Sequence, residues 1–226
     1  MNSTWVIVPA YNEALVLPSV LEPVRAAGYE IVVVDDGSDD LTFERARSLG
    51  VHALRHRVNL GQGAALRTGM EYAVARGADF LVHFDADGQH RAEEIEKLVA
   101  PVAAGRADIA VGSRFLDSRG SIEAPRSKRA ALRVGAFLNG LLTGVWLSDV
   151  HNGFRALSRE AAQRIHLTQS GYAHATEIIS QARARGLRIA EVSVNIRYTD
   201  YSKQKGQPLA SAFSIVWDLL AGKLQR

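Results

Sequence analysis

The sequence predicts a doubly wound α/β fold built on a mainly parallel sheet. Between residues 4 and 115, five apolar, β-branched runs alternate with segments whose apolar residues recur at helical spacing. The run Ile31-Val32-Val33-Val34 is continuously apolar, as expected for a strand that helices cover on both faces. Alternation of this kind favours parallel strands joined by right-handed crossovers.

The elements of the first half are separated by clear stop signals. Gly28 and Gly50 follow the first two helical patterns, and glycine is a common residue just after a helix. The third strand is the weakest, because His52, Arg55 and His56 interrupt it. The expected strands are residues 4–9, 31–34, 51–57, 79–84 and 109–112, and the expected helices are 16–27, 41–49, 62–76 and 92–104.

After Phe115 the pattern changes. Residues 117–125 are polar and contain Gly and Pro, which indicates a loop, and a helix with apolar residues from Val134 to Val145 comes next. Six basic residues lie within 20 positions here: Arg114, Arg119, Arg126, Lys128, Arg129 and Arg133. Beyond them we expect a short strand within 150–157, a helix from Ser158 to Ile165, a helix over 175–185, a strand over 189–197, a Lys-rich loop over 198–207 and a last helix from Pro208.

Composition limits the class of protein. Hydrophobic residues are 47% and charged residues 23%, as in soluble globular proteins. The absence of cysteine excludes disulfides and thiolate metal sites. The first residues lack the features of a signal peptide, and the longest apolar stretch, Val134 to Leu147, is too short to span a membrane. We therefore expect a cytoplasmic protein, and the net charge of +3 gives no reason to expect a nucleic-acid partner.

Acidic side chains come after the first, second and fourth strands. They are Glu13, the pair Asp35-Asp36, and Asp85 with Asp87. The carboxyl ends of strands in a doubly wound sheet meet at one crevice, where such folds bind ligands. Asp-Ala-Asp-Gly taken alone is also typical of an ordinary turn. Together the clusters predict a metal-assisted reaction on a phosphorylated substrate, because Mg²⁺ and Mn²⁺ take oxygen ligands and are shared with phosphates.

Other phosphate-binding classes fail on their motifs. Gly61-Gln62-Gly63 begins a dinucleotide fingerprint, but Leu66 stands at the third glycine and the segment comes after the third strand. No Gly-Lys-Ser/Thr sequence marks a P-loop. A dinucleotide-dependent oxidoreductase is therefore not expected.

A set of motifs in order over residues 5–160 resembles a known family. The motifs are Val8-Pro9-Ala10-Tyr11-Asn12-Glu13, Val34-Asp35-Asp36-Gly37-Ser38, Asn59-Leu60-Gly61 through Gly69, Asp85-Ala86-Asp87-Gly88-Gln89-His90, Gly112-Ser113-Arg114-Phe115, and Ser148-Asp149 with Gly153-Phe154-Arg155. The chain resembles a family-2 glycosyltransferase of the GT-A type, close to the dolichyl- or polyprenyl-phosphate sugar synthases. The resemblance implies a Rossmann-like single domain, with a nucleotide-sugar half over 1–115 and an acceptor-side half with a C-terminal helix over 116–226.

The resemblance also implies a donor site for a UDP- or GDP-linked sugar. Asp85 would face the donor and, with Asp87 and Gln89, hold Mg²⁺ or Mn²⁺ against the diphosphate, and members of this kind invert the anomeric carbon. The residues expected to line the nucleotide are Pro9, Ala10, Tyr11, Glu13 and Asp36, and those expected to close over the diphosphate are Arg197, Ser202 and Lys203.

Two acceptors are compatible with the motifs. For a polyprenyl phosphate, Arg114, Arg126 and Arg129 would hold the acceptor phosphate, which is an anion and needs no general base. For a sugar hydroxyl in polysaccharide or glycolipid synthesis, a base is needed, and Asp149 has the best position. We expect hexosyl transfer to a polyprenyl phosphate, with hydroxyl transfer and a non-catalytic nucleotide-sugar-binding protein as the alternatives.

The apolar stripes around Phe137 and Trp217 have two interpretations. They pack as core, or they form a membrane-facing or homodimer surface, since amphipathic helices with basic neighbours bind the membrane interface. The second interpretation corresponds to an enzyme at the inner face of the membrane.

Overall fold

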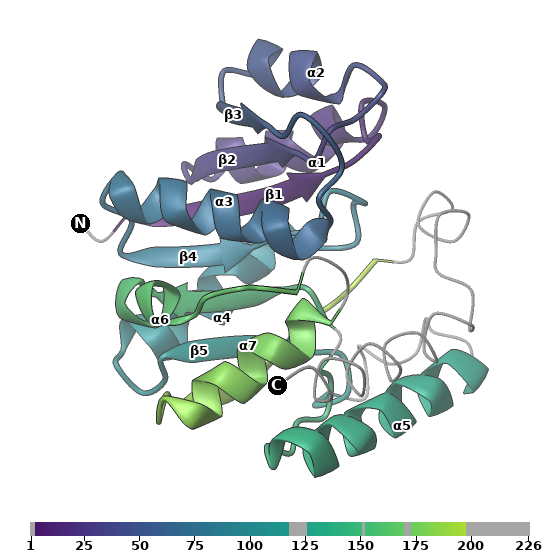
Figure 1. Ribbon diagram of the computed structural model, residues 1–226, viewed down its shortest axis with the longest axis vertical. Coiled ribbons are helices and arrows are strands. Elements are labelled where there is room, and N and C mark those ends of the chain that lie inside the picture. Colours follow the sequence, from purple (N-terminus) through teal and green to yellow (C-terminus); the bar gives the residue numbers. More distant parts are fainter. Residues whose placement is uncertain (1–2, 118–125, 151, 170–172, 198–226) are drawn as a thin grey trace.

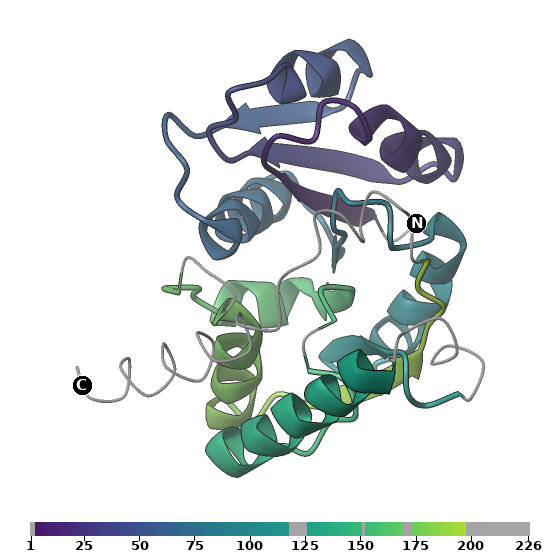
Figure 2. The ribbon, with the colours of Figure 1, turned by 90° about the vertical axis from the view of Figure 1, so that its right-hand side faces the viewer.

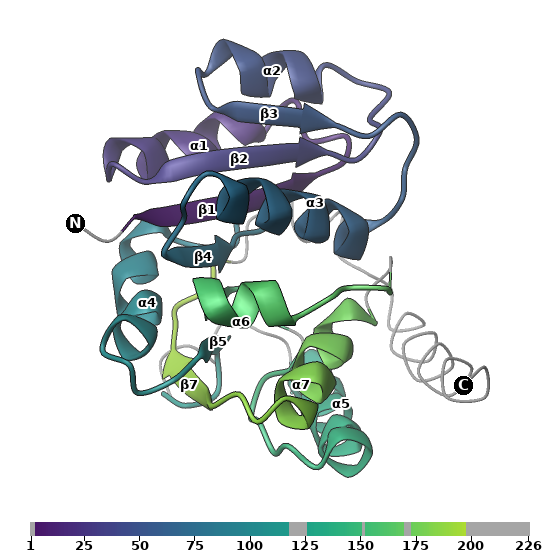
Figure 3. The ribbon, with the colours of Figure 1, turned by 60° about the vertical axis from the view of Figure 1, so that its left-hand side comes forward.

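The structure is a computed structural model that describes residues 3–117, 126–150, 152–169 and 173–197, with the backbone alone for 126–131. In this part of the chain a seven-stranded sheet lies between two layers of helices (Figures 1 and 3). The strands are β1 (Thr4–Ala10), β2 (Glu30–Asp35), β3 (His52–Arg55), β4 (Phe80–His83), β5 (Ile109–Ser113), β6 (Arg155–Ser158) and β7 (Ile189–Ser193). The helices are α1 (Leu17–Ala26), α2 (Thr42–Ser48), α3 (Gln62–Ala75), the 3₁₀ helix η1 (Ala92–Glu94), α4 (Ile95–Ala103), α5 (Arg126–Thr143), α6 (Arg159–Arg164) and α7 (His174–Ala184).

The strand order is β3-β2-β1-β4-β6-β5-β7, and every neighbouring pair is parallel except those made by β6. The expected doubly wound, mainly parallel sheet is confirmed. β6 enters antiparallel between β4 and β5, so that its first residue, Arg155, pairs with His83 and Val111. The residues just before β6 therefore reach the edge at which β4 and β5 end.

The helices cover both faces of the sheet, as the continuous apolar strands require. One core cluster joins the sheet to α3, α6 and α7, and a second joins it to α1, α2 and α4. α3 lies so close to β1 that a Cβ atom at Gly69 would overlap the Ile7 side chain. This close approach brings the start of α3 to the carboxyl edge of the sheet.

The later elements agree with the sequence, with one change of length. α5 begins at Arg126 and lies beside α7 (Figure 2). The expected strand over 189–197 ends at Ser193, and the backbone N–H of Arg197 donates to the carbonyl of Gln89 at 2.9 Å. The expected loop over 198–207 and the last helix lie outside the described residues.

Candidate active site

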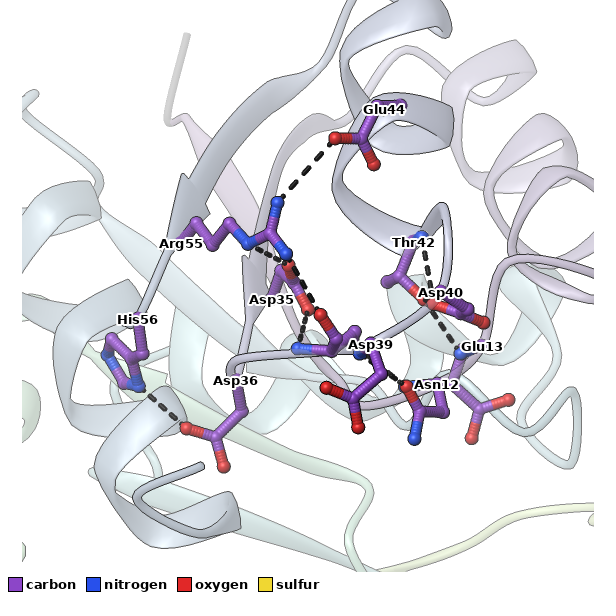
Figure 4. A network of polar contacts seen from close by, with 11 residues as sticks. Asn12, Glu13, Asp35, Asp36, Asp39, Asp40, Thr42, Glu44, Arg55 and His56 are labelled. Atoms are coloured by element: carbon purple, nitrogen blue, oxygen red, sulfur yellow. Dashed lines mark hydrogen bonds and ion pairs between the residues drawn. The ribbon is translucent and has the colours of Figure 1, made fainter. Parts of the chain in front are cut away.

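Hydrogen bonds join the loop after β1 to the turn after β2 (Figure 4). The backbone N–H of Asn12 donates to Ser38 Oγ at 2.9 Å, and that of Glu13 donates to Thr42 Oγ1 at 2.8 Å. Asn12 adopts a positive φ of 54°, a conformation that asparagine tolerates better than most residues. These bonds fix the loop that carries the expected nucleotide-binding residues.

Three of those residues are buried at the edge of the sheet, and one is partly open to solvent. Pro9, Ala10 and Glu13 are buried, whereas Tyr11 keeps 40% of its surface exposed. An aromatic ring exposed next to a fixed, buried loop can stack on a flat ligand. The geometry is compatible with a nucleotide base at Tyr11.

The two carboxylates after β2 are both engaged by the chain. Asp35 pairs with Arg55 at 3.1 Å. Asp36 accepts from His56 Nδ1 at 2.7 Å and from the backbone N–H groups of Leu60 at 3.0 Å and Gly61 at 2.7 Å. Asp36, expected to hold the base, therefore anchors the loop that leads into α3.

Both oxygens of Asp85, the first carboxylate of the Asp-x-Asp motif, contact a polar side chain. Gln62 Nε2 donates to Asp85 Oδ1 at 2.9 Å, and His90 Nε2 lies 3.1 Å from Asp85 Oδ2. Gly153 packs against this carboxylate so closely that a Cβ atom there would overlap it. Sequence reasoning assigned no role to Gln62 or His90, although both stand in the quoted motifs.

The two carboxylates of this motif differ in pKa. Burial works to raise the pKa of Asp85, but the hydrogen bond and charge of His90, together with the charges of His174 and Arg155, outweigh it, and the pKa lies below its usual value. Burial, followed by the charge of Asp85, raises the pKa of Asp87 to about 6. Asp87 thus carries a negative charge that the chain compensates only weakly.

A buried arginine, Arg155, interacts electrostatically with Asp85 and Asp149. Burial lowers the pKa of Arg155 to about 10, against the opposing effects of Asp85 and Asp149. Its Nη2 donates to the Val150 carbonyl at 2.9 Å, while Nε and Nη1 have no hydrogen-bond partner among the described residues. Opposite it on β4, burial and then the charge of Arg155 lower the pKa of His83 to about 3, so this imidazole is neutral.

The residues expected to hold a metal offer oxygen atoms suited to Mg²⁺ or Mn²⁺. Asp85 and Asp87 supply carboxylates, Gln89 supplies an amide, and the Gln89 backbone N–H donates to Asp87 Oδ1 at 3.0 Å. No group of three or more His, Asp or Glu side chains that could hold a metal occurs in the described part of the chain. The chain compensates the charge of Asp87 poorly. The two carboxylates therefore fit a divalent cation that is also bound by a phosphate of the substrate.

Arg197 lies on the α1 side of this loop. A cavity of about 270 Å³ has Asp87, His90, Arg91 and Arg197 in its wall, with apolar residues of α1 opposite. The structure thus places Arg197 beside the Asp85-Ala86-Asp87 motif, and its expected role at a diphosphate stays a prediction. Ser202 and Lys203 lie outside the described residues.

On the acceptor side, Arg114 and Asp149 bind each other. Arg114 Nε and Nη2 donate to the two oxygens of Asp149 at 2.6 and 2.7 Å, and the Arg114 backbone N–H adds a third bond at 3.1 Å. Both residues are more than nine-tenths buried. Sequence reasoning treated them as alternatives, a phosphate ligand or a base; the structure shows one bidentate pair.

A hydrogen-bond chain supports this pair. Glu191 accepts from Ser148 Oγ at 2.6 Å, and Ser148 Oγ lies 2.6 Å from Ser113 Oγ. Phe115, the next residue after Arg114, lies near two guanidinium groups, those of Arg114 and Arg133, at 5.8 and 5.9 Å from the ring centre. The side chains of Arg126 and Arg129, expected to bind the acceptor phosphate, lie outside the described residues.

Comparisons with known proteins agree with this fold. The family model described as glycosyl transferase family 2 matches residues 5–165. The chain is 31% identical over 240 residues to a UDP-N-acetylglucosamine–dolichyl-phosphate N-acetylglucosaminyltransferase of Methanococcus voltae, covering 97% of this chain and 96% of that protein. It is 32% identical over 237 residues to a polyprenol monophosphomannose synthase of Mycolicibacterium smegmatis, covering 99% of this chain and 89% of that protein.

A solved structure shares the fold. Glucosyl-3-phosphoglycerate synthase from Mycobacterium tuberculosis, in complex with Mn²⁺, UDP and glucosyl-3-phosphoglycerate, superposes with a TM-score of 0.71 at 24% identity, covering 99% of this chain and 79% of that chain. Fold and sequence matches together define a glycosyltransferase with the GT-A fold. The chain belongs to glycosyltransferase family 2, and its relatives are of the polyprenyl-phosphate sugar synthase branch, as the motifs led us to expect.

We expect the removal of one partner of the Arg114–Asp149 pair to destabilise the fold strongly. Asp149→Ala should lower the free energy of unfolding by about 3–5 kcal/mol, because it leaves a buried guanidinium without its counter-charge. The double variant Arg114→Met/Asp149→Leu should recover much of the loss, since apolar replacement of a buried pair is often neutral. Urea unfolding measures both.

The control is Glu22→Ala, which removes an exposed ion pair to Arg25 at 2.9 Å. Such pairs contribute at most about 1 kcal/mol. An Asp149→Ala variant that loses no more stability than this control would contradict the buried-pair interpretation.

Proposed function

We propose that this glycosyltransferase moves a hexosyl group, with inversion, from a UDP- or GDP-linked sugar to a polyprenyl phosphate. The observation that carries the proposal is the buried Arg114–Asp149 pair, which fixes a guanidinium at the same sheet edge as Asp85 and Asp87. The names of the relatives support a lipid-phosphate acceptor, and the structural neighbour's complex with Mn²⁺ and UDP supports a metal-assisted nucleotide donor.

On the donor side, residues 1–115 form the nucleotide-sugar half. Tyr11, with Pro9, Ala10 and Glu13, lines the base and ribose, and Asp36 holds the neighbouring loop in place. Asp85, Asp87 and Gln89 hold Mg²⁺ or Mn²⁺, which when bound stabilises negative charge on the departing nucleoside diphosphate. Two basic side chains, Arg197 and Lys203, bind the diphosphate, and the Ser202 hydroxyl donates a hydrogen bond to it.

On the acceptor side, residues 116–226 supply Arg126 and Arg129, which bind the phosphate together with Arg114 from the end of the first half. Arg114, with Arg126 and Arg129, orients an acceptor phosphate oxygen toward the anomeric carbon. That oxygen forms the new bond while the bond from the anomeric carbon to the diphosphate oxygen breaks, and the nucleoside diphosphate leaves with the electron pair. The phosphate is already an anion, so Asp149 acts as the positioning residue of Arg114 and not as a general base.

A lipid acceptor requires that the enzyme reach a bilayer. Within the described residues no helix is long and apolar enough to cross a membrane. Val134, Phe137 and Leu141 of α5 are more than half exposed, as is Trp146, whose ring centre lies 5.6 Å from that of Phe137. We call these four residues the α5 face and propose that it rests on the cytoplasmic leaflet.

Asp87→Ala tests the donor half. We expect kcat/KM to fall at least about 100-fold. Replacing a residue that only orients a metal ligand typically lowers metal affinity or activity 10- to 100-fold, and Asp87 is itself a metal ligand in the proposed mechanism. Turnover of UDP- and GDP-sugars in Mn²⁺ measures the loss, and circular dichroism checks folding. A folded variant with wild-type turnover would exclude the metal role of Asp87.

Arg114→Ala and the milder Arg114→Lys test the acceptor half. We expect KM for a short polyprenyl phosphate to rise about 10- to 100-fold, since a hydrogen bond to a charged group contributes about 1.5–3 kcal/mol. Nucleoside diphosphate affinity, measured by calorimetry, should stay unchanged. The matching polyprenol should not be an acceptor; efficient transfer to its hydroxyl would refute the phosphate proposal.

The α5 face is tested by vesicle sedimentation with anionic and zwitterionic lipids. Phe137→Ser should weaken vesicle binding about 10-fold or more, because burying such a side chain contributes about 1.5–3 kcal/mol. Leu41→Ser is the control, since Leu41 is 60% exposed beside α2, away from α5. Equal loss in both variants, or none in either, would argue against membrane docking by this face.

A further inference from the structure

Asp85 is held by two side chains from different parts of the fold. Gln62, the first residue of α3, donates to Asp85 Oδ1 at 2.9 Å, and His90, at the end of the metal-binding motif, lies 3.1 Å from Oδ2. We call Gln62, Asp85 and His90 the carboxylate clamp. The clamp belongs to the donor site, so any role inferred for it rests on the proposed function.

Gln62 has a fixed position because the loop before it is anchored. Asp36 accepts from the backbone N–H groups of Leu60 and Gly61, at 3.0 and 2.7 Å. Gly61 has a φ of 92°, a conformation that favours glycine, and it turns the chain directly into α3. The side chain of Gln62 therefore starts from a backbone that the buried Asp36 determines.

His56 connects Asp36 to α3 by hydrogen bonds. His56 Nδ1 lies 2.7 Å from Asp36 Oδ1, and its Nε2 lies 2.9 Å from Thr68 Oγ1, further along the helix from Gln62. The loop and the helix are thus tied to one imidazole. This arrangement leaves Gln62 little freedom to move away from Asp85.

His90 is fixed from the opposite side. Its ring stacks on Phe154 with centres 4.7 Å apart and planes 19° apart, and it meets Phe84 edge-on at 5.4 Å. Only 8% of the residue is exposed. Gly153, next to Phe154, packs against the Asp85 carboxylate so closely that a Cβ atom would overlap it.

We propose that Gln62 is a positioning residue of the donor site, which together with His90 fixes the orientation in which Asp85 meets the metal and the donor. A carboxylate free to rotate loses conformational freedom when it binds, whereas one already oriented does not. Outer partners that orient a metal ligand typically change metal affinity 10- to 100-fold when they are removed. Gln62 acts through Asp85, without itself supplying a ligand.

The experiment compares Gln62→Ala with wild type by titrating Mn²⁺ into protein with UDP or GDP, whichever wild type binds. Calorimetry gives the affinity, and the Mn²⁺ electron paramagnetic resonance signal reports the bound ion independently of turnover. We expect a 10- to 100-fold weaker Mn²⁺ affinity in Gln62→Ala, with nucleotide affinity in the absence of metal unchanged. Gln181→Ala is the control, because the Gln181 amide donates to the His166 carbonyl at 2.6 Å, away from the Asp85 carboxylate.

His90→Phe separates the hydrogen bond from the packing, because a phenyl ring can keep the stack on Phe154 but cannot donate to Asp85. It should also weaken Mn²⁺ binding, and its effect should be non-additive with Gln62→Ala, since the two residues hold one carboxylate. Folded Gln62→Ala protein with wild-type Mn²⁺ affinity would overturn the inference while leaving the proposed function intact. A wild-type protein without Mn²⁺-dependent nucleotide binding would overturn the proposed function and this inference with it.

Discussion

The need to compensate buried negative charge shapes the carboxyl edge of this sheet. Among the carboxylates buried at this edge, Asp35 pairs with Arg55, Asp36 with His56 and two backbone N–H groups, and Asp149 with Arg114. An uncompensated buried carboxylate costs several kcal/mol, so each of these contacts fixes a loop as it satisfies a charge. The rigid loops of the site result from this requirement.

The exceptions to full compensation lie at the proposed metal site. Burial and the neighbouring charge of Asp85 raise the pKa of Asp87 to about 6, and Arg155 keeps two N–H groups without hydrogen-bond partners among the described residues. Proteins retain such imperfectly satisfied groups mainly where function requires them. The excess negative charge at Asp87 is one that a divalent cation would neutralise, whereas Asp35, Asp36 and Asp149 are paired with cationic or imidazole side chains of the chain itself.

Much of this was predictable from the sequence, and the remainder has identifiable causes. Continuous apolar runs and glycine stops are local signals, so the parallel strands and their helices could be located. β6 has only four residues, and nothing in Arg155-Ala156-Leu157-Ser158 reveals that it runs antiparallel between β4 and β5. The pairing of Arg114 with Asp149, 35 positions apart, depends on that insertion and so could not be seen. Gln62 was hidden for a different reason, because its role depends on where Asp36 anchors the preceding loop.

The segment before β6 links the two halves that the sequence suggested. Asp149 binds Arg114 at the proposed acceptor site, Gly153 packs against Asp85 at the proposed donor site, and Phe154 stacks on His90. These residues come from the second half of the chain, yet two of them complete the surroundings of a donor-side carboxylate. A parallel strand at this place would begin at the opposite edge, and its preceding loop could make none of these contacts. The antiparallel direction of β6 is therefore what allows one short segment to set the positions of Arg114 and Asp85 together, as a direct displacement between two bound substrates requires.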